Sequence, residues 1–162
     1  MKSQPTTRRR VQKKSPRPTF DKYDYYTKSV QSAEGDVVFL RKTYKELRKK
    51  EPKTLREDFC GTFALSCEWV KMGSRFSALG LDLDPEPLEY GRSHHLAKLT
   101  SDQQKRIQLT EKNVLNPGLP SVDLAIAMNF SYFVFKILSL MKLYFANVFR
   151  SLKKDGVFIL DC

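Results

Sequence analysis

The sequence predicts an α/β domain built on a doubly wound, mostly parallel sheet. From residue 54 onward, apolar segments of strand length alternate with segments whose apolar residues recur at helical spacing. This alternation is typical of parallel sheets with crossover helices. Two strand-length segments end in acids, at 57–58 and at 82. Neighbouring acidic strand ends in such a sheet form a crevice suited to a nucleoside ligand.

Length and composition indicate one soluble domain. A chain of 162 residues with 41% hydrophobic and 29% charged residues can bury a sizeable core. No segment has the roughly 18 uncharged apolar residues of a membrane span, and the basic N-terminus lacks the apolar region of a secretory signal. Three cysteines without metal-ligand spacing favour a reducing compartment. We therefore expect a cytoplasmic protein without a metal site or membrane contact.

The first segment, residues 1–19, is predicted to be a disordered basic tail. Residues 1–20 carry seven basic side chains and no acid, so they hold most of the net charge of +11. Few large apolar residues are present, so burial cannot offset the entropy of ordering. The basic side chains between residues 2 and 17 suit contact with RNA phosphates. The alternative is a solvated tail without a defined partner.

Residues 20–52 form a second segment, with aromatic residues at 20–26 followed by an expected helix. Val37, Leu40, Tyr44 and Leu47 recur at helical spacing, which predicts a helix over about 34–49. Pro52 ends it, because the residue before a proline is biased away from the helical region. The aromatic residues would serve either as a hydrophobic anchor or as a lid over a ligand.

The third segment, 53–162, contains the alternating elements. Strands are expected at about 54–59, 76–82, 107–110, 122–128 and 157–160, and helices at about 62–73, 84–98 and 134–152. Asp84 suits the N-cap of the second of these helices, and Pro85 suits its first position. The last strand ends with the chain, which leaves an apolar edge uncovered. This suggests a C-terminally shortened domain, or one completed by a partner such as a second copy in a homodimer.

Four motifs together carry a family resemblance. Residues 55–62 (LREDFCGT), 81–88 (LDLDPEPL), 129–133 (NFSYF) and 151–156 (SLKKDG) resemble a little-characterised subgroup of the class I, Rossmann-like methyltransferases that depend on S-adenosylmethionine (SAM). The resemblance covers about 54–162, the first part of that domain. It implies SAM as the cofactor and an unknown methyl acceptor, with 53–162 as an incomplete SAM-binding domain.

The resemblance assigns the first loop to the methionine end of the cofactor. Gly61 would allow close backbone approach there, because glycine has no side chain. Aligned on residues 60–62, the three glycines usual in the family become Phe59, Gly61 and Phe63 in this sequence. Glu57 or Asp58 would face the cofactor's amino group. Strand alternation lets only one of them point into the crevice, and the sequence does not decide which.

The later motifs are assigned to the nucleoside and the methyl group. Asp82 would accept hydrogen bonds from both ribose hydroxyls, and Leu83 would form an apolar wall against the adenine. The resemblance also implies that Asn113 contacts the adenine amino group, next to the backbone amide of Val114. Asn129 and Phe130 would lie beside the sulfonium.

Three function classes follow. The first is a SAM-dependent methyltransferase, for which methyl transfer needs positioning more than acid or base catalysis, so no catalytic residue is assigned. The second, a nicotinamide-dependent oxidoreductase, is disfavoured because a Gly-x-Gly-x-x-Gly turn is missing. The third is a non-catalytic methyltransferase-like module that binds RNA or a partner through its basic tail.

Overall fold

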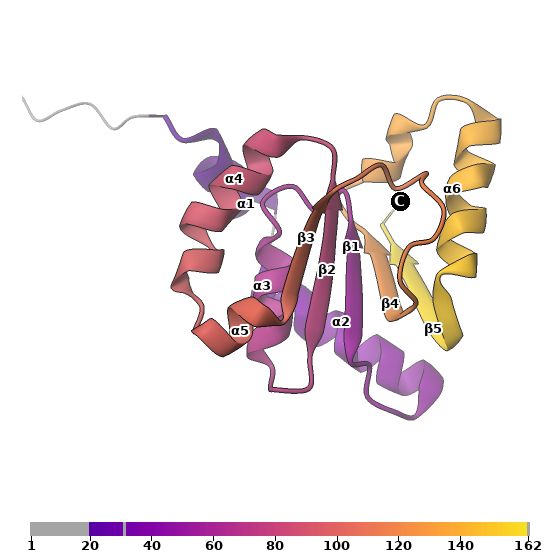
Figure 1. Cartoon of the computed structure of the whole chain (residues 1–162), viewed down its shortest axis with the longest axis horizontal. Coiled ribbons are helices and arrows are strands. Elements are labelled where there is room, and N and C mark those ends of the chain that lie inside the picture. The colour runs from indigo at the N-terminus through magenta and orange to yellow at the C-terminus, as the bar shows by residue number, and fades with distance from the viewer. Residues whose placement is uncertain (1–19, 31, 162) are drawn as a thin grey trace, which may run out of the picture.

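A computed structural model describes residues 20–30 and 32–161, and the predicted tail lies outside the described residues (Figure 1). The described helices are α1 (Lys22–Val30), α2 (Ala33–Arg48), α3 (Ala64–Lys71), α4 (Pro85–His94), α5 (Ser101–Lys105) and α6 (Leu138–Arg150), with short 3₁₀ turns η1 (Leu96–Lys98) and η2 (Ser131–Val134). The strands are β1 (Thr54–Asp58), β2 (Ser77–Asp82), β3 (Ile107–Glu111), β4 (Val122–Ala127) and β5 (Leu152–Leu160).

The described strands form one sheet in the order β3-β2-β1-β4-β5, and all neighbours pair in parallel. At the centre, Leu55 of β1 pairs with Ala78 of β2 on one side and Leu124 of β4 on the other. The chain winds outward from β1 in one direction and from β4 in the other. This confirms the predicted doubly wound α/β fold. It also places a topological switch point between β1 and β4, where such sheets open a crevice at their carboxyl ends.

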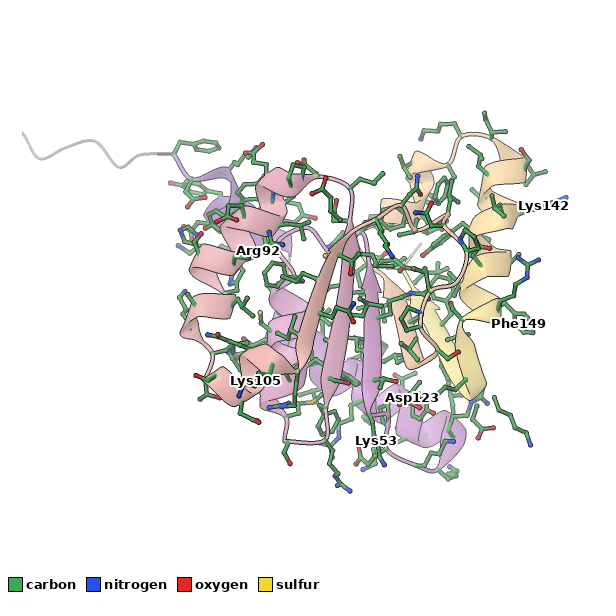
Figure 2. All side chains as sticks on the ribbon, in the orientation of Figure 1. Lys53, Arg92, Lys105, Asp123, Lys142 and Phe149 are labelled. Carbon is green, nitrogen blue, oxygen red and sulfur yellow. The ribbon has the colours of Figure 1, made fainter. Side chains whose placement is uncertain are left out.

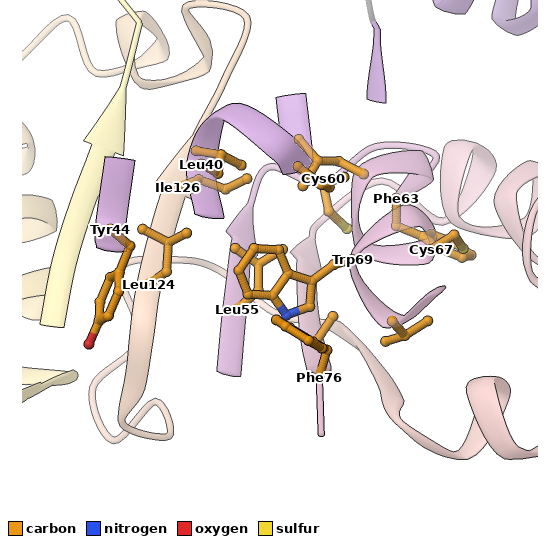
Figure 3. Packing of buried hydrophobic residues seen from close by; sticks show 14 of the residues in the cluster. Leu40, Tyr44, Leu55, Cys60, Phe63, Cys67, Trp69, Phe76, Leu124 and Ile126 are labelled. Atoms are coloured by element: carbon orange, nitrogen blue, oxygen red, sulfur yellow. The ribbon is translucent and has the colours of Figure 1, made fainter. Parts of the chain in front are cut away.

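One face of the sheet is covered by α2, α3 and α4. Trp69 of α3 is fully buried against Phe76, with ring centroids 5.4 Å apart in an edge-on arrangement (Figure 3). Leu40 and Tyr44 of α2 pack in the same cluster as Leu55. The expected apolar character of 62–73 is therefore explained, because α3 lies between the sheet and its neighbouring helices.

The opposite face is covered by α6, η2 and the loop that follows β3. Its core contains Leu81, Ala125, Tyr144 and Val148. Successive strand residues alternate between the two cores, as pleated strands require. The outer face of α6 carries exposed apolar side chains, including Phe149 at 79% exposure (Figure 2).

Some boundaries differ from the sequence predictions. The aromatic segment forms its own helix, α1. The helix expected over 84–98 ends at His94 and continues as η1 and α5, and the helix expected from 134 begins at Leu138. The N-cap prediction is confirmed, because the Asp84 side chain accepts a hydrogen bond from the Glu86 amide.

The last strand begins at Leu152, five residues earlier than expected. Its pairing with β4 shifts register between Val122 and Leu124, so residues 153–156 form an irregular stretch. The Arg48 guanidinium donates to the Asp155 carbonyl from α2. An edge strand tolerates such an irregularity and its charged side chains, because only one side of it is hydrogen-bonded in the described sheet.

None of the described helices is both long enough and apolar enough to cross a lipid bilayer.

Candidate functional site

A cavity of about 370 Å³ opens at the carboxyl ends of the central strands. It is lined by Lys22, Tyr23, Tyr26, Phe59, Cys60, Gly61, Thr62, Pro87, Asn129 and Ser131. The residues come from α1, the turn after β1, the start of α4 and the turn after β4. Three of the predicted site residues, Phe59, Gly61 and Asn129, are among them. The cavity therefore lies at the switch point between β1 and β4.

The turn after β1 has an unusual backbone. Phe59, Gly61 and Phe63 all have positive φ, at 57°, 50° and 46°. All three residues have the left-handed conformation that favours glycine, although two of them are phenylalanines. A Cβ on Gly61 would meet no atom within 4 Å, so the Gly61 backbone faces open space.

The Phe63 ring is fully buried, and its packing holds the turn in place. A Cβ on Gly91 of α4 would lie 2.4 Å from the Phe63 ring. Gly91 therefore makes room for the ring, and burial of the ring offsets the strain of its backbone.

Asp82, at the end of β2, is tied to two turns. Its Oδ2 accepts a hydrogen bond of 2.7 Å from the Gly61 amide, and its Oδ1 accepts one of 3.0 Å from the Asp84 amide. A carboxylate oxygen can accept two hydrogen bonds, so both oxygens retain capacity for a ligand. The side chain is only partly buried, which keeps that capacity accessible.

The two acids at the end of β1 point to opposite faces of the sheet. Asp58 Oδ1 and Oδ2 accept hydrogen bonds of 2.8 and 3.1 Å from Arg56, and Oδ2 accepts another of 2.9 Å from the Tyr144 hydroxyl. Glu57 Oε2 instead accepts from the amide and hydroxyl of Ser66 in α3, at 3.0 and 2.5 Å. Burial raises the pKa of Glu57 to about 7. Neither acid is among the described lining residues, so their cofactor role stays a prediction.

The turn after β4 is held by an acid from the end of β5. Asn129 and Phe130 have φ of 58° and 55°, and their amides donate to the two carboxylate oxygens of Asp161 at 2.8 and 2.9 Å. Asn129 lines the cavity, whereas the Phe130 side chain is 51% exposed and stacks on Phe133 with centroids 5.8 Å apart.

The predicted adenine contacts lie beside Asp82 and outside the cavity lining. The Lys112 amide donates to the Asp82 carbonyl at 3.0 Å, which brings the loop after β3 alongside the end of β2. In that loop Asn113 uses its Oδ1 to accept from the Leu115 amide, and the Val114 side chain is buried in the core. Leu83 is 59% exposed at the same edge.

Helix α1 contributes lining residues, which the sequence analysis raised only as a lid, one of two alternatives for the aromatic residues at 20–26. Tyr23 packs on Tyr90 of α4 with centroids 4.7 Å apart, and the Tyr90 hydroxyl donates to Asp21 at 3.0 Å. These contacts hold α1 beside α4 (Figure 1). Tyr23, Tyr26 and Lys22 of α1 line the cavity. The signal available in the sequence was the aromatic run at 20–26. Cys60, Thr62, Pro87 and Ser131 also line the cavity without having been predicted to do so.

Acidic groups give the region behind the cavity a negative field. Burial is the main cause of the raised pKa values of Glu57, Asp36 and Tyr26. Negative charges add to it, those of Asp82 and Asp36 at Glu57 and that of Asp161 at Asp36 and Tyr26. Such a field favours a cationic ligand. Within the described part of the chain, no group of three or more potential metal-ligating side chains is arranged to hold a metal ion.

Comparison with known proteins shows a fold shared with several solved methyltransferase structures. No protein-family profile and no curated protein matches the sequence. Among solved structures, the chain is similar to a SAM-bound amino pentose methyltransferase from Micromonospora echinaspora, at 18% identity with a TM-score of 0.68. A sugar N-methyltransferase from Streptoalloteichus sp. also has 18% identity and a TM-score of 0.68, and a SAM-dependent methyltransferase from Clostridium acetobutylicum has 20% and 0.66.

The similarity covers most of this chain and part of each neighbour. The aligned regions cover 91%, 96% and 85% of the chain, and 58%, 60% and 55% of the three solved chains, in the order given above. The chain thus spans less than two thirds of the length of these structures. At this level of identity the comparison shows a shared fold.

Proposed function

We propose that the chain binds SAM at the carboxyl ends of β1, β2 and β4 and transfers its methyl group to an acceptor. The observation that carries the proposal is the Asp82 carboxylate, fixed by the Gly61 and Asp84 amides at the edge of the cavity. A fixed carboxylate at the end of the second strand is suited to a ribose diol. The fold shared with a SAM-bound methyltransferase supports the same ligand.

The residues present fit this cofactor. Two ribose hydroxyls would donate to Asp82, whose oxygens each have room for another hydrogen bond. The open space at Gly61 would accommodate the amino-acid arm of SAM where it joins the ribose, and this arm would extend into the cavity. SAM carries a sulfonium and an ammonium, and the acids behind the cavity would stabilise both charges. Glu57 would contribute to SAM binding through this negative field.

The remaining predicted contacts complete the binding mode. Leu83 would lie against the adenine as an exposed apolar wall, and Asn113 with the Val114 amide would bind its polar edge. Asn129 and Phe130 would border the sulfonium, with an aromatic face available for positive charge.

The chemistry required of the protein is positioning. Bound SAM supplies an electrophilic methyl group, and the nucleophile of the acceptor attacks it in line. The left-handed turn held by Asp161 would fix Asn129 beside that path, and α1 would limit access of water. Catalysis of this kind does not require an acid–base pair in the site.

Titration calorimetry of the full chain with SAM, S-adenosylhomocysteine (SAH) and NAD tests the proposal. We expect saturable binding of SAM and SAH and no binding of NAD. An exposed acid on α5, Asp102, provides the matched control, because Asp102→Ala removes the same charge far from the site in sequence and should leave SAM affinity unchanged. Binding of NAD, or of neither sulfur ligand, would contradict the proposal.

A second candidate function is a module that binds RNA through residues 2–17. The supporting observation is the charge distribution, with seven of the basic residues before residue 21 and no acid among them. Fluorescence anisotropy with a labelled single-stranded RNA would compare the chain with a variant in which those seven residues are glutamine. We expect the variant to lose RNA affinity and the salt dependence to flatten. Equal affinity of the two proteins would remove this candidate.

A further inference from the structure

Lys22, the first residue of α1, places a positive charge at the mouth of the cavity. It is the charged side chain among the described lining residues. Its Nζ lies 2.5 Å from Glu86 Oε1 of α4 and 4.7 Å from the centroid of the Tyr23 ring, and the side chain is about half exposed. The residue is therefore held at the surface of the cavity by neighbours on both helices.

The acids near the cavity determine which kind of ligand would need a cation at this position. Asp36 and Asp82 lie close enough to Glu57 for their charges to add to the effect of burial in raising its pKa. A ligand that carries both an ammonium and a carboxylate would have its ammonium stabilised by these acids. Its carboxylate would be repelled by them and would require a cation on the other side of the cavity.

The Lys22 ammonium has N–H donors available for such a carboxylate. An ammonium has three N–H donors, and the Glu86 ion pair uses one of them. The position of α1 does not depend on Lys22 alone, since Tyr23 packs on Tyr90 and Asp21 accepts from the Tyr90 hydroxyl. The Lys22 ammonium can thus engage a ligand while the helix stays docked on α4.

We propose that Lys22 binds the carboxylate of the amino-acid arm of SAM and of SAH, and so makes α1 part of the cofactor site. This inference rests on the proposed function. It adds a specificity: the site would distinguish nucleosides that carry an amino-acid arm from those that do not. Lys22 would act here as a cofactor-binding residue contributed by the N-terminal helix, separate from the strand ends that bind the ribose.

The test compares two ligands across four variants. SAH carries the amino-acid arm, and 5′-methylthioadenosine shares its nucleoside and sulfur without that arm. Lys22→Met should weaken SAH binding roughly tenfold, which is the lower end for a hydrogen bond to a charged group because the site is partly exposed. It should leave 5′-methylthioadenosine affinity unchanged. Lys22→Arg should restore SAH affinity.

Two controls separate the charge of Lys22 from its surroundings. Lys28→Met removes another lysine of α1, which pairs with Asp24 outside the cavity, and should leave SAH binding unchanged. Glu86→Gln breaks the ion pair of Lys22 from the other side and leaves its ammonium in place. SAH affinity should then be retained or increased.

The outcomes distinguish this inference from the proposed function. Wild-type affinity of Lys22→Met for SAH would overturn the inference alone, and so would an equal loss of both ligands. A loss in Glu86→Gln as large as that in Lys22→Met would assign the effect to docking of α1 and would also overturn it. Failure of the unaltered protein to bind SAH would remove the proposed function, and the inference with it.

Discussion

The Asp82 carboxylate and the Gly61 amide, 21 positions apart in the chain, form a hydrogen bond of 2.7 Å that joins the end of β2 to the turn after β1. The same carboxylate accepts from the Asp84 amide at the entrance to α4. One side chain thus sets the relative position of two loops at the cavity. A ligand that binds Asp82 would meet a carboxylate already oriented, which lowers the cost of ordering on binding.

Asp82→Ala is expected to weaken SAM binding by roughly 1–3 kcal/mol, because hydrogen bonds between the ribose and a charged acceptor are lost. Calorimetry with SAM measures the change, and circular dichroism establishes that the variant is folded. The matched control is Asp102→Ala, whose carboxylate is on α5. A folded Asp82→Ala variant with the dissociation constant of the original protein would exclude Asp82 from the site.

Glycine substitutions in the first turn should have different effects at Phe59 and Phe63. Both residues have positive φ, which costs about 1–2 kcal/mol for a residue other than glycine. Phe63 is fully buried, and removing such a ring costs about 3–5 kcal/mol, so Phe63→Gly should lose about 2–3 kcal/mol of stability. Phe59 is only partly buried, so the two effects nearly cancel and Phe59→Gly should change stability by less than about 1 kcal/mol.

Urea denaturation of the two variants measures this difference. Stabilisation by both Phe59→Gly and Phe63→Gly would show that backbone conformation outweighs burial in this turn, and equal destabilisation would show that the partly buried Phe59 ring contributes as much as the Phe63 ring. A strong loss at Phe59 alone would show that its contacts with Phe135 and Tyr144, at 5.9 and 5.7 Å between centroids, matter more than its partial burial indicates.

The sheet could be predicted because its strands are local patterns. β2 and β4 are short, mostly apolar runs, and β1 and β2 end in acids. Their alternation with helices leaves few topologies. Gly61 and Asn129 were assigned to the site from the family resemblance, and both line the cavity. The hydrogen-bond partners of the two acids of β1 could not be predicted, because Asp58 accepts from Tyr144, 86 positions away in the chain.

The sequence offered the aromatic residues at 20–26 either as an anchor or as a lid, and it could not decide whether they reach the cavity. The position of α1 depends on hydrogen bonds such as that from Tyr90 to Asp21, 69 positions apart in the chain. Such contacts leave no periodic signal in the sequence. The early start of β5 was missed for a related reason. Its residues 153–156 are mostly charged, and they are held in place by α2 residues such as Arg48, which no local pattern reveals.

Glu57 should make stability fall as the pH rises from about 4.5 to 7. Its pKa in the folded chain is about 7, against an ordinary value of 4.5, so the folded state binds the proton more tightly. The contribution is fully present below the unfolded pKa and is lost as the pH passes through the folded pKa. The full effect is about 3 kcal/mol.

Urea denaturation between pH 4.5 and 7.5 tests this dependence. Glu57→Gln keeps an oxygen that can accept from Ser66 and has no proton to lose, so its profile should be flatter than that of the original protein. The two proteins should be similar at pH 4.5 and diverge in favour of the variant at pH 7.5. Parallel profiles would mean that Glu57 titrates near its ordinary pKa.

Behind the cavity, the buried pair of Arg56 and Asp58 should be essential for folding but replaceable as a unit. Arg56→Met leaves the Asp58 carboxylate buried with the Tyr144 hydroxyl as its remaining partner, and breaking a buried pair in this way costs about 3–5 kcal/mol. Arg56→Met with Asp58→Leu removes both charges, so most of that loss should be recovered. Chemical denaturation of the single and double variants gives the coupling free energy directly. Additive losses would show that the pair contributes as two independent side chains, and the turn that leads from β1 into the cavity would then be anchored by packing alone.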